Sequence, residues 1–247
     1  PRMQLTHAAN THVGMVRSGN EDAMHAEADA ARGLYMVADG MGGHAAGEVA
    51  SAMAIELIAA SVRRATEVAV PALGPVLTDA VRDANRTIYQ RTIAEPDKQG
   101  MGTTATTLVV GGGRWIIGHV GDSRCYLLRD GTLTQVTRDH SYVQEQVDAG
   151  YLTPEQAKYH PFSNVITRCI GVQQEVVPDV LEGELRAGDL FLLASDGLTG
   201  MVDDPVLHRI LSQRPSPGPM VDALIREANR AGGVDNITAV VVKIIAP

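Results

Sequence analysis

Basic charge, aromatic residues and cysteine are all scarce in this sequence. Its 247 residues carry 21 Lys and Arg against 29 Asp and Glu, which gives a formal charge of −8, and only 4% are aromatic. Nucleic-acid binding through phosphate contacts needs a concentrated basic face, so this class is excluded. The two cysteines, Cys125 and Cys169, are too few for a disulfide framework. We therefore expect a reducing, cytoplasmic compartment.

Long hydrophobic runs are absent as well. Apolar stretches such as residues 237–242 are far shorter than a membrane span, and the N-terminal region lacks a signal-peptide pattern. We expect no membrane segment in this chain. A sequence that begins at Pro1 can still be the cytoplasmic domain of a longer, membrane-anchored protein. Hydrophobic residues make up 45%, which is typical of a globular protein.

Short apolar runs alternate with Ala-rich runs of helical spacing along the whole chain. The patterns predict helices at residues 45–64, 77–94, 204–211 and 220–231. They predict strands at residues 34–38, 103–110, 114–120, 124–128, 133–136, 176–181, 190–194 and 237–245. We predict a single α+β domain over residues 1–247, built as a four-layer α-β-β-α sandwich of two mainly antiparallel sheets flanked by helix pairs. A polar, weakly helical excursion is expected at about 141–165.

Aspartates stand where several of the predicted strands stop. They are Asp39, Asp122, Asp196 and Asp235, each beside glycine or asparagine. A single such aspartate is most often a turn residue. Four of them can converge on one edge, where carboxylates repel one another unless cations lie between them. Oxygen ligands favour Mg²⁺ or Mn²⁺, and the zinc motifs Cys-x-x-Cys and His-Glu-x-x-His are missing.

Eight short motifs then identify a family. They are residues 16–22 (VRSGNED), 38–44 (ADGMGGH), 102–104 (GTT), 118–124 (GHVGDSR), 139–140 (DH), 166–168 (ITR), 195–199 (SDGLT) and 233–238 (GVDNIT). In this order they resemble the metal-dependent protein phosphatases of the PPM (PP2C) family, and its bacterial branch in particular. The resemblance covers nearly the whole chain and implies the same sandwich fold.

The resemblance implies two core metal ions, Mn²⁺ or Mg²⁺. Asp39 matches the residue that bridges the two ions, and the Gly40 carbonyl matches a ligand of one of them. Asp196 and Asp235 match the ligands of the other ion. These assignments follow from the motifs, not from spacing alone.

Three further roles follow from the same resemblance. Glu21 matches an acidic position that reaches the metals through water. Asp122, together with Asp196, matches the ligands of a third, weaker ion. Arg17 matches the phosphate-binding arginine, a role that suits its planar, permanently charged guanidinium.

The implied reaction is hydrolysis of phosphoserine and phosphothreonine in proteins. Two metal ions acidify a bridging water, and the resulting hydroxide attacks phosphorus in line without a covalent intermediate. Neither Cys125 nor Cys169 has the arginine six residues later that a thiolate phosphatase requires. We expect the partners to be phosphorylated proteins and a cognate bacterial Ser/Thr kinase, and the chain to be a monomer.

The proton donor for the leaving group is left open. His44 follows the Asp-Gly pair by four positions, and Met41 stands where animal relatives have a histidine. The acid is His44, a metal-bound water or none, and His44 could equally cap a helix. His119 and His140 are interpreted as structural. The excursion at 141–165 matches a flap, which we expect to gate substrate entry.

Two other functions compete with this one. Ser123, in Gly-Asp-Ser, resembles the nucleophile block of a serine esterase, although the pair Asp204 and His208 does not fit the late motif of that class. The second alternative is a phosphatase-like binding module without activity. Such modules lose their metal carboxylates, whereas this chain keeps all four.

Overall fold

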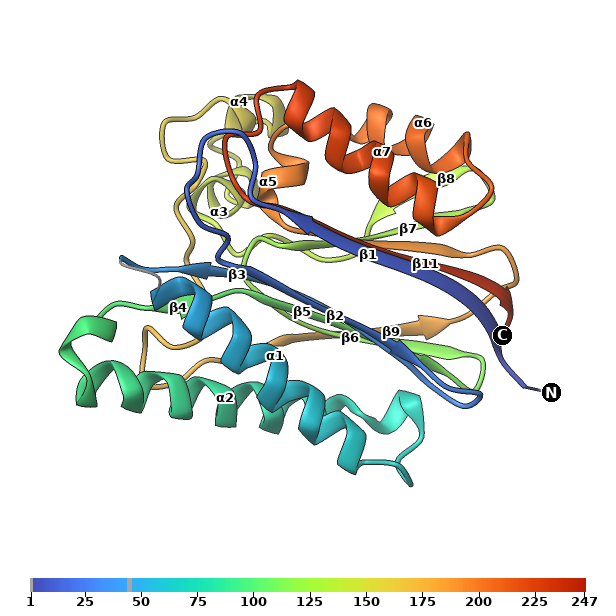
Figure 1. Ribbon diagram of the computed structural model, residues 1–247, viewed down its shortest axis with the longest axis horizontal. Helices are drawn as coiled ribbons and strands as arrows, with labels where there is room; N and C mark the ends of the chain where they lie inside the picture. Colours follow the sequence, from blue (N-terminus) through green and yellow to red (C-terminus); the bar gives the residue numbers. More distant parts are fainter. Residues whose placement is uncertain (1, 44–45) are drawn as a thin grey trace.

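The computed structural model describes residues 2–43 and 46–247. Two antiparallel sheets stack face to face, and a pair of helices covers the outer face of each (Figure 1). This arrangement confirms the predicted four-layer sandwich.

One sheet holds the two ends of the chain. Its strands, in spatial order, are β1 (Gln4–His12), β11 (Ile237–Ala246), β10 (Leu190–Ala194), β7 (Arg124–Arg129) and β8 (Thr132–Gln135). Helices α6 (Asp204–Ser212) and α7 (Pro217–Arg230) cover it. The short helix α5 (Asp196–Thr199) follows β10 directly.

The other sheet is assembled from the first half of the chain and one late strand. Its order is β2 (Asp22–Ala28), β3 (Gly33–Met41), β5 (Ala105–Gly111), β6 (Arg114–Val120) and β9 (Asp179–Glu184), with β4 (Gly102–Thr103) paired to the end of β3. Helices α1 (Ala46–Arg64) and α2 (Gly74–Ala94) cover it. Two 3-10 turns, η1 (Val70–Ala72) and η2 (Pro96–Lys98), flank α2.

The central strands are apolar at successive positions because both of their faces are buried. In β3, Tyr35 and Val37 pack between the two sheets, whereas Leu34 and Met36 pack under α1 and α2. Successive side chains of a strand point to opposite faces, so a segment buried on both sides can be apolar at every position. This explains why residues 34–38 form an uninterrupted apolar run.

Three edge strands depart from the predicted pattern. β1 and β2 were not predicted, because polar residues interrupt both strands and almost all of their side chains are at least partly exposed. The strand predicted at 176–181 is found three residues later, as β9. Val176 is buried among the residues under α1 and α2, so its apolar character reflects packing and not strand pairing.

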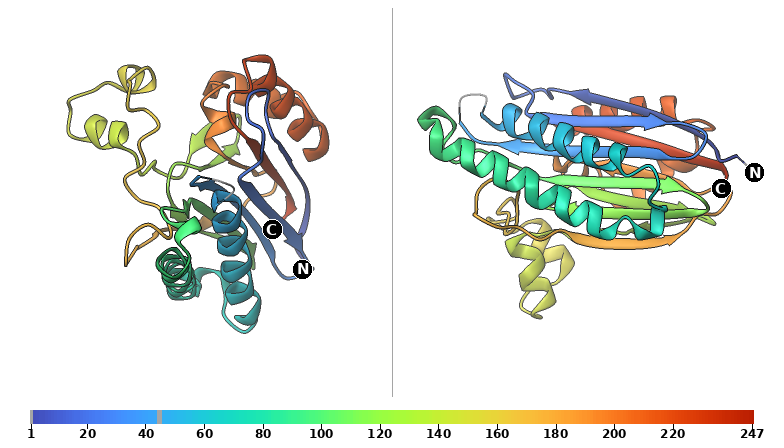
Figure 2. Two further views of the ribbon diagram at one scale, coloured as in Figure 1. Left: turned by 60° about the vertical axis from the view of Figure 1, so that its left-hand side comes forward. Right: turned by 90° about the horizontal axis from the view of Figure 1, so that it is seen from below.

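The segment between His140 and Thr167 leaves the sandwich and stands to one side (Figure 2). We call residues 141–165 the flap. It carries α3 (Tyr142–Asp148) and α4 (Pro154–Lys158). Ser141 caps α3, and Thr153 forms a capping box with Gln156 at α4. In the described part of the chain, no helix is both long and apolar enough to cross a bilayer.

Candidate active site

Four chain segments bring aspartates to one end of the sandwich. Asp39 lies near the end of β3, and Asp122 lies between β6 and β7. Asp196 is the first residue of α5, and Asp235 directly precedes β11. Figure 1 shows the end of β3 and helix α5 at this end of the sandwich. β3 belongs to one sheet, and α5 follows β10, which belongs to the other. The site is therefore assembled from both sheets.

Three of these carboxylates form a tight group. Oxygens of Asp39, Asp122 and Asp196 all lie within 4.8 Å of one another. Burial, followed by the charge of Asp196, raises the pKa values of Asp39 and Asp122 well above their ordinary range. Like charges this close in a poorly solvated site are costly, so either protons or cations must neutralise them.

Asp22 is a member of the cluster that the sequence interpretation missed. It is buried and accepts a hydrogen bond from the Thr238 hydroxyl at 2.6 Å. Burial is the main cause that raises its pKa to about 6, and Asp196 also contributes. Its sequence neighbours gave no signal of this role, because only the antiparallel register of β2 with β3 places Asp22 opposite Asp39.

Asp235 lies beside the predicted phosphate ligand. Its Oδ1 is 3.5 Å from Nε of Arg17, whose side chain is 56% exposed and so open to a ligand. Burial, then Asp196, raises the pKa of Asp235, while Arg17 opposes the shift. Asp235 is therefore within the electrostatic influence of both Arg17 and Asp196.

Asn236 joins the segments that carry the other predicted residues. Its Nδ2 donates to the carbonyls of Val13 and Gly19 at 2.9 Å, on both sides of Arg17. Its Oδ1 accepts from the backbone N–H of Glu21 at 2.9 Å. One buried amide therefore fixes the Arg17 loop and Glu21 relative to β11. These contacts span more than two hundred residues of sequence, so no local pattern could predict them.

Glycines allow the end of β3 to approach the start of α1. A Cβ on Gly40 would lie 1.9 Å from the Gly47 carbonyl oxygen, and a Cβ on Gly47 would lie 1.7 Å from Oε2 of Glu21. The Gly40 N–H donates to the Glu21 carbonyl at 3.0 Å. Glu21 therefore packs against the first turn of α1, and its pKa is raised mainly by burial.

The residues present fit a divalent metal centre. Oδ1 of Asp22, Asp122 and Asp196 are each buried without a hydrogen-bond partner, which is unusual for polar atoms in a protein interior. Carboxylate oxygens are the ligands preferred by Mg²⁺ and Mn²⁺. Cations bound at this cluster would both coordinate these unpaired oxygens and neutralise the repulsion among the carboxylates.

The other sequence candidates are less well placed for chemistry. Ser123 is fully buried, and its hydroxyl shares a 2.7 Å hydrogen bond with Thr104, so a substrate cannot reach it as the esterase alternative requires. Burial raises the pKa of the Cys125 thiol, and raises that of Cys169 to about 11. His44 lies outside the described residues.

Comparison with known proteins identifies the family. The family described as Protein phosphatase 2C matches residues 14–231. The serine/threonine protein phosphatase PstP of Mycobacterium tuberculosis is 44% identical over 98% of this chain, which spans 45% of the length of PstP. The serine/threonine phosphatase stp of Listeria welshimeri is 37% identical over 94% of this chain and 93% of its own length.

A solved structure extends the comparison to the fold. The catalytic domain of the serine/threonine protein phosphatase PstP, in complex with two manganese ions, superposes with a TM-score of 0.85 at 41% identity, covering 99% of this chain and all of the other. This chain belongs to the protein phosphatase 2C family of serine/threonine protein phosphatases.

Proposed function

We propose that this chain is a metal-dependent phosphatase that hydrolyses phosphoserine and phosphothreonine in proteins. The observation that carries the proposal is the group of Asp39, Asp122 and Asp196, whose carboxylate oxygens lie within 4.8 Å of one another. The exposed Arg17, next to Asp235, supports it. The PstP catalytic domain, similar over its whole length, contains two manganese ions. We expect Mn²⁺ or Mg²⁺ here too.

The ligand set that we propose keeps the sequence assignments. Asp39, the Gly40 carbonyl, Asp196 and Asp235 would bind the two core ions. Glu21 would contribute through water. Asp122 and Asp196 would bind a third ion. Bound divalent cations supply Lewis-acid chemistry, by lowering the pKa of water and neutralising phosphoryl oxygens.

The chain's own residues bind and orient the phosphate. The exposed guanidinium of Arg17 presents a fork that matches two phosphoryl oxygens. Asp235, 3.5 Å from its Nε, restricts the direction in which that fork points. Asn236 holds the backbone on both sides of the arginine through Val13 and Gly19. This support favours a fixed phosphate position in front of the carboxylate group.

Direct in-line hydrolysis, without a phosphoenzyme, is the finer part of the proposal. Two observations support it. The raised pKa values of Cys125 and Cys169 leave both thiols protonated near neutral pH, and the hydroxyl of Ser123 is buried and engaged. These side chains are therefore poor nucleophiles. His44 stays our candidate for the residue that protonates the leaving serine or threonine oxygen.

The substrates of such an enzyme are made by Ser/Thr protein kinases, so we propose an opposing kinase as its functional partner. The flap, which stands beside the sandwich, is the segment that we expect to contact the protein around the phosphorylated residue. Its exposed aromatic side chains, Tyr151, Tyr159 and Phe162, offer apolar contacts for a peptide.

The test compares hydrolysis of phosphoserine, phosphothreonine and phosphotyrosine peptides with and without Mn²⁺. We expect activity on the first two that chelation abolishes. Asp39→Ala and Asp235→Ala should each lower kcat/KM at least a hundredfold, and Arg17→Lys should raise KM more than it lowers kcat. Asp83→Ala, an exposed aspartate on α2, is the matched control and should behave as wild type. Full activity in Asp39→Ala and Asp235→Ala would refute the proposal.

A further inference from the structure

Two reciprocal hydrogen bonds join His140 to Gly121, the residue before Asp122. The backbone N–H of His140 donates to the Gly121 carbonyl at 2.9 Å. The backbone N–H of Gly121 donates to Nδ1 of the His140 ring, also at 2.9 Å. This pair of bonds fixes both the position and the direction of the peptide that leads into Asp122.

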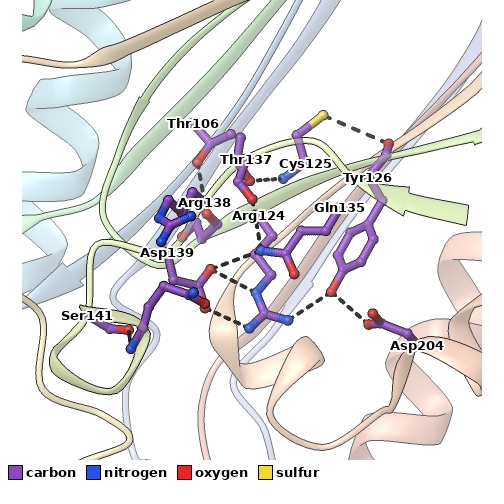
Figure 3. Close-up of polar contacts among 12 residues, drawn as sticks. Thr106, Arg124, Cys125, Tyr126, Gln135, Thr137, Arg138, Asp139, Ser141 and Asp204 are labelled. Carbon is purple, nitrogen blue, oxygen red and sulfur yellow. Dashed lines mark hydrogen bonds and ion pairs between the residues drawn. The ribbon is translucent and has the colours of Figure 1, made fainter. Parts of the chain in front are cut away.

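A half-buried ion pair makes a second attachment on the other side of Asp122. The guanidinium of Arg124 donates two hydrogen bonds to the carboxylate of Asp139, at 2.9 and 2.7 Å (Figure 3). It also donates to the Tyr126 hydroxyl at 2.9 Å. Residues 121–124 are therefore held to residues 139–140 at both ends, while Oδ1 of Asp122 has no partner.

The orientation of the His140 ring is itself fixed. Because Nδ1 accepts from Gly121, the proton resides on Nε2, which donates to the Asp179 carboxylate at 2.8 Å. The other oxygen of Asp179 accepts from Arg168 at 2.8 Å. A carboxylate behind a histidine in this way selects its tautomer and stops the ring from rotating.

The same histidine stands at the base of the flap. Its carbonyl accepts from the N–H of Thr167 at 3.0 Å, just beyond the flap. The next residue, Ser141, forms a bridge with Ile166. Arg138, on the other side of His140, pairs with Asp148 of α3. Both ends of the flap therefore meet at the residue that holds Gly121.

We propose that His140 is a positioning residue that holds the metal ligand Asp122 through Gly121 and connects it to the base of the flap. The inference rests on the proposed function, since Asp122 must be a ligand. Its consequence is reciprocal: filling the Asp122 site steadies the flap, and an ordered flap strengthens binding at that site. Outer residues that orient metal ligands change affinity by about 10- to 100-fold when replaced.

The test measures Mn²⁺ binding to metal-stripped protein by calorimetry. Wild type should show two tight sites and a weaker third, and Asp122→Asn should lose the third. His140→Leu should weaken the third site about tenfold or more and leave the tight sites unchanged. His140→Asn, whose Oδ1 can still accept from Gly121, should recover part of that affinity. His208→Leu is the matched control, because His208 also bonds a glycine backbone, at Gly131, far from the site.

A second readout tests the connection to the flap. Saturating Mn²⁺ should slow proteolytic cleavage within residues 149–153 in wild type, and should lose that effect in His140→Leu. Asp179→Ala keeps the His140 imidazole but removes the carboxylate that fixes its orientation. It should also weaken the third site, and it replaces His140→Leu as the test if that variant does not fold. Unchanged third-site affinity in the folded variants, or equal weakening of all sites, would overturn the inference. Absence of Mn²⁺ binding or of phosphatase activity in wild type would instead remove the proposed function.

Discussion

Asp22 lies directly opposite Asp39 in the antiparallel pair of β2 and β3. Like charges in such a position destabilise a sheet, and here both side chains adjoin Asp196. Strand pairing alone would not select this arrangement. It is the expected result if the two aspartates serve a cation site.

The first prediction concerns Asp22. In chelator, Asp22→Asn should stabilise the protein by about 1 kcal/mol, because it removes a like charge while its amide oxygen still accepts from Thr238. For a chain of this length, that is a rise of about 2–4 °C in Tm. With saturating Mn²⁺ the gain should vanish or reverse. Thermal unfolding with and without metal measures both effects, and a loss of stability in chelator would contradict the prediction.

The second prediction is the pH dependence of the metal-free protein. The pKa of Asp22 is raised from 3.8 to about 6, so the folded state holds this proton more tightly than the unfolded chain does. Stability should therefore fall as the pH rises from 4 to 6, by on the order of 2 kcal/mol, and then level off. Asp22→Asn should flatten this slope. Unfolding curves at pH 5 and 7 in chelator decide the sign, and a stability that rises over this interval would be inconsistent with the raised pKa.

The third prediction separates metal binding from folding. Mn²⁺ at a hundred times its dissociation constant should stabilise wild type by about 2.7 kcal/mol for each independent site. Asp39→Asn should lose most of this stabilisation and nearly all phosphatase activity. Its metal-free form should nevertheless be at least as stable as wild type, because a crowded charge is gone. If metal-free Asp39→Asn unfolds more easily, Asp39 has a structural role that we have not assigned.

The fourth prediction tests the close approach of β3 to α1. Gly47→Ala places a methyl group 1.7 Å from the present position of Glu21 Oε2, so the carboxylate must move. We expect at least a tenfold loss of kcat/KM, although alanine is the better helix former. Gly218→Ala in the first turn of α7 is the control, since no atom lies within 4 Å of the added methyl. Equal effects of the two substitutions would show that the space around Glu21 is not important.

The sequence predicted the central features of the fold and most of the carboxylates. Strands buried on both faces contain long apolar runs, and the aspartates proposed to bind metal stand where those runs stop, so both are visible locally. The edge strands are not, because polar residues interrupt β1 and β2, and β1 pairs with a segment at the far end of the chain. Asp22 was missed for the same reason: only the register with β3 places it opposite Asp39.

The supporting contacts were also beyond prediction. Asn236 follows a predicted ligand, but its partners Val13, Gly19 and Glu21 lie at the other end of the chain. His140 was interpreted as structural, whereas its ring bonds the backbone next to Asp122. A motif identifies which residues matter, but it does not specify which distant atoms hold them.

The pairing of β1 with β11 has a consequence for synthesis of the protein. Residues 4–12 are synthesised more than two hundred residues before their partner strand, residues 237–246. Asp235, a proposed metal ligand, and Asn236, which fixes the Arg17 loop, emerge just before that strand. If the proposed ligand set is correct, we expect no phosphatase activity from a growing chain until residues 235–246 have been translated, and none from a product truncated before residue 235.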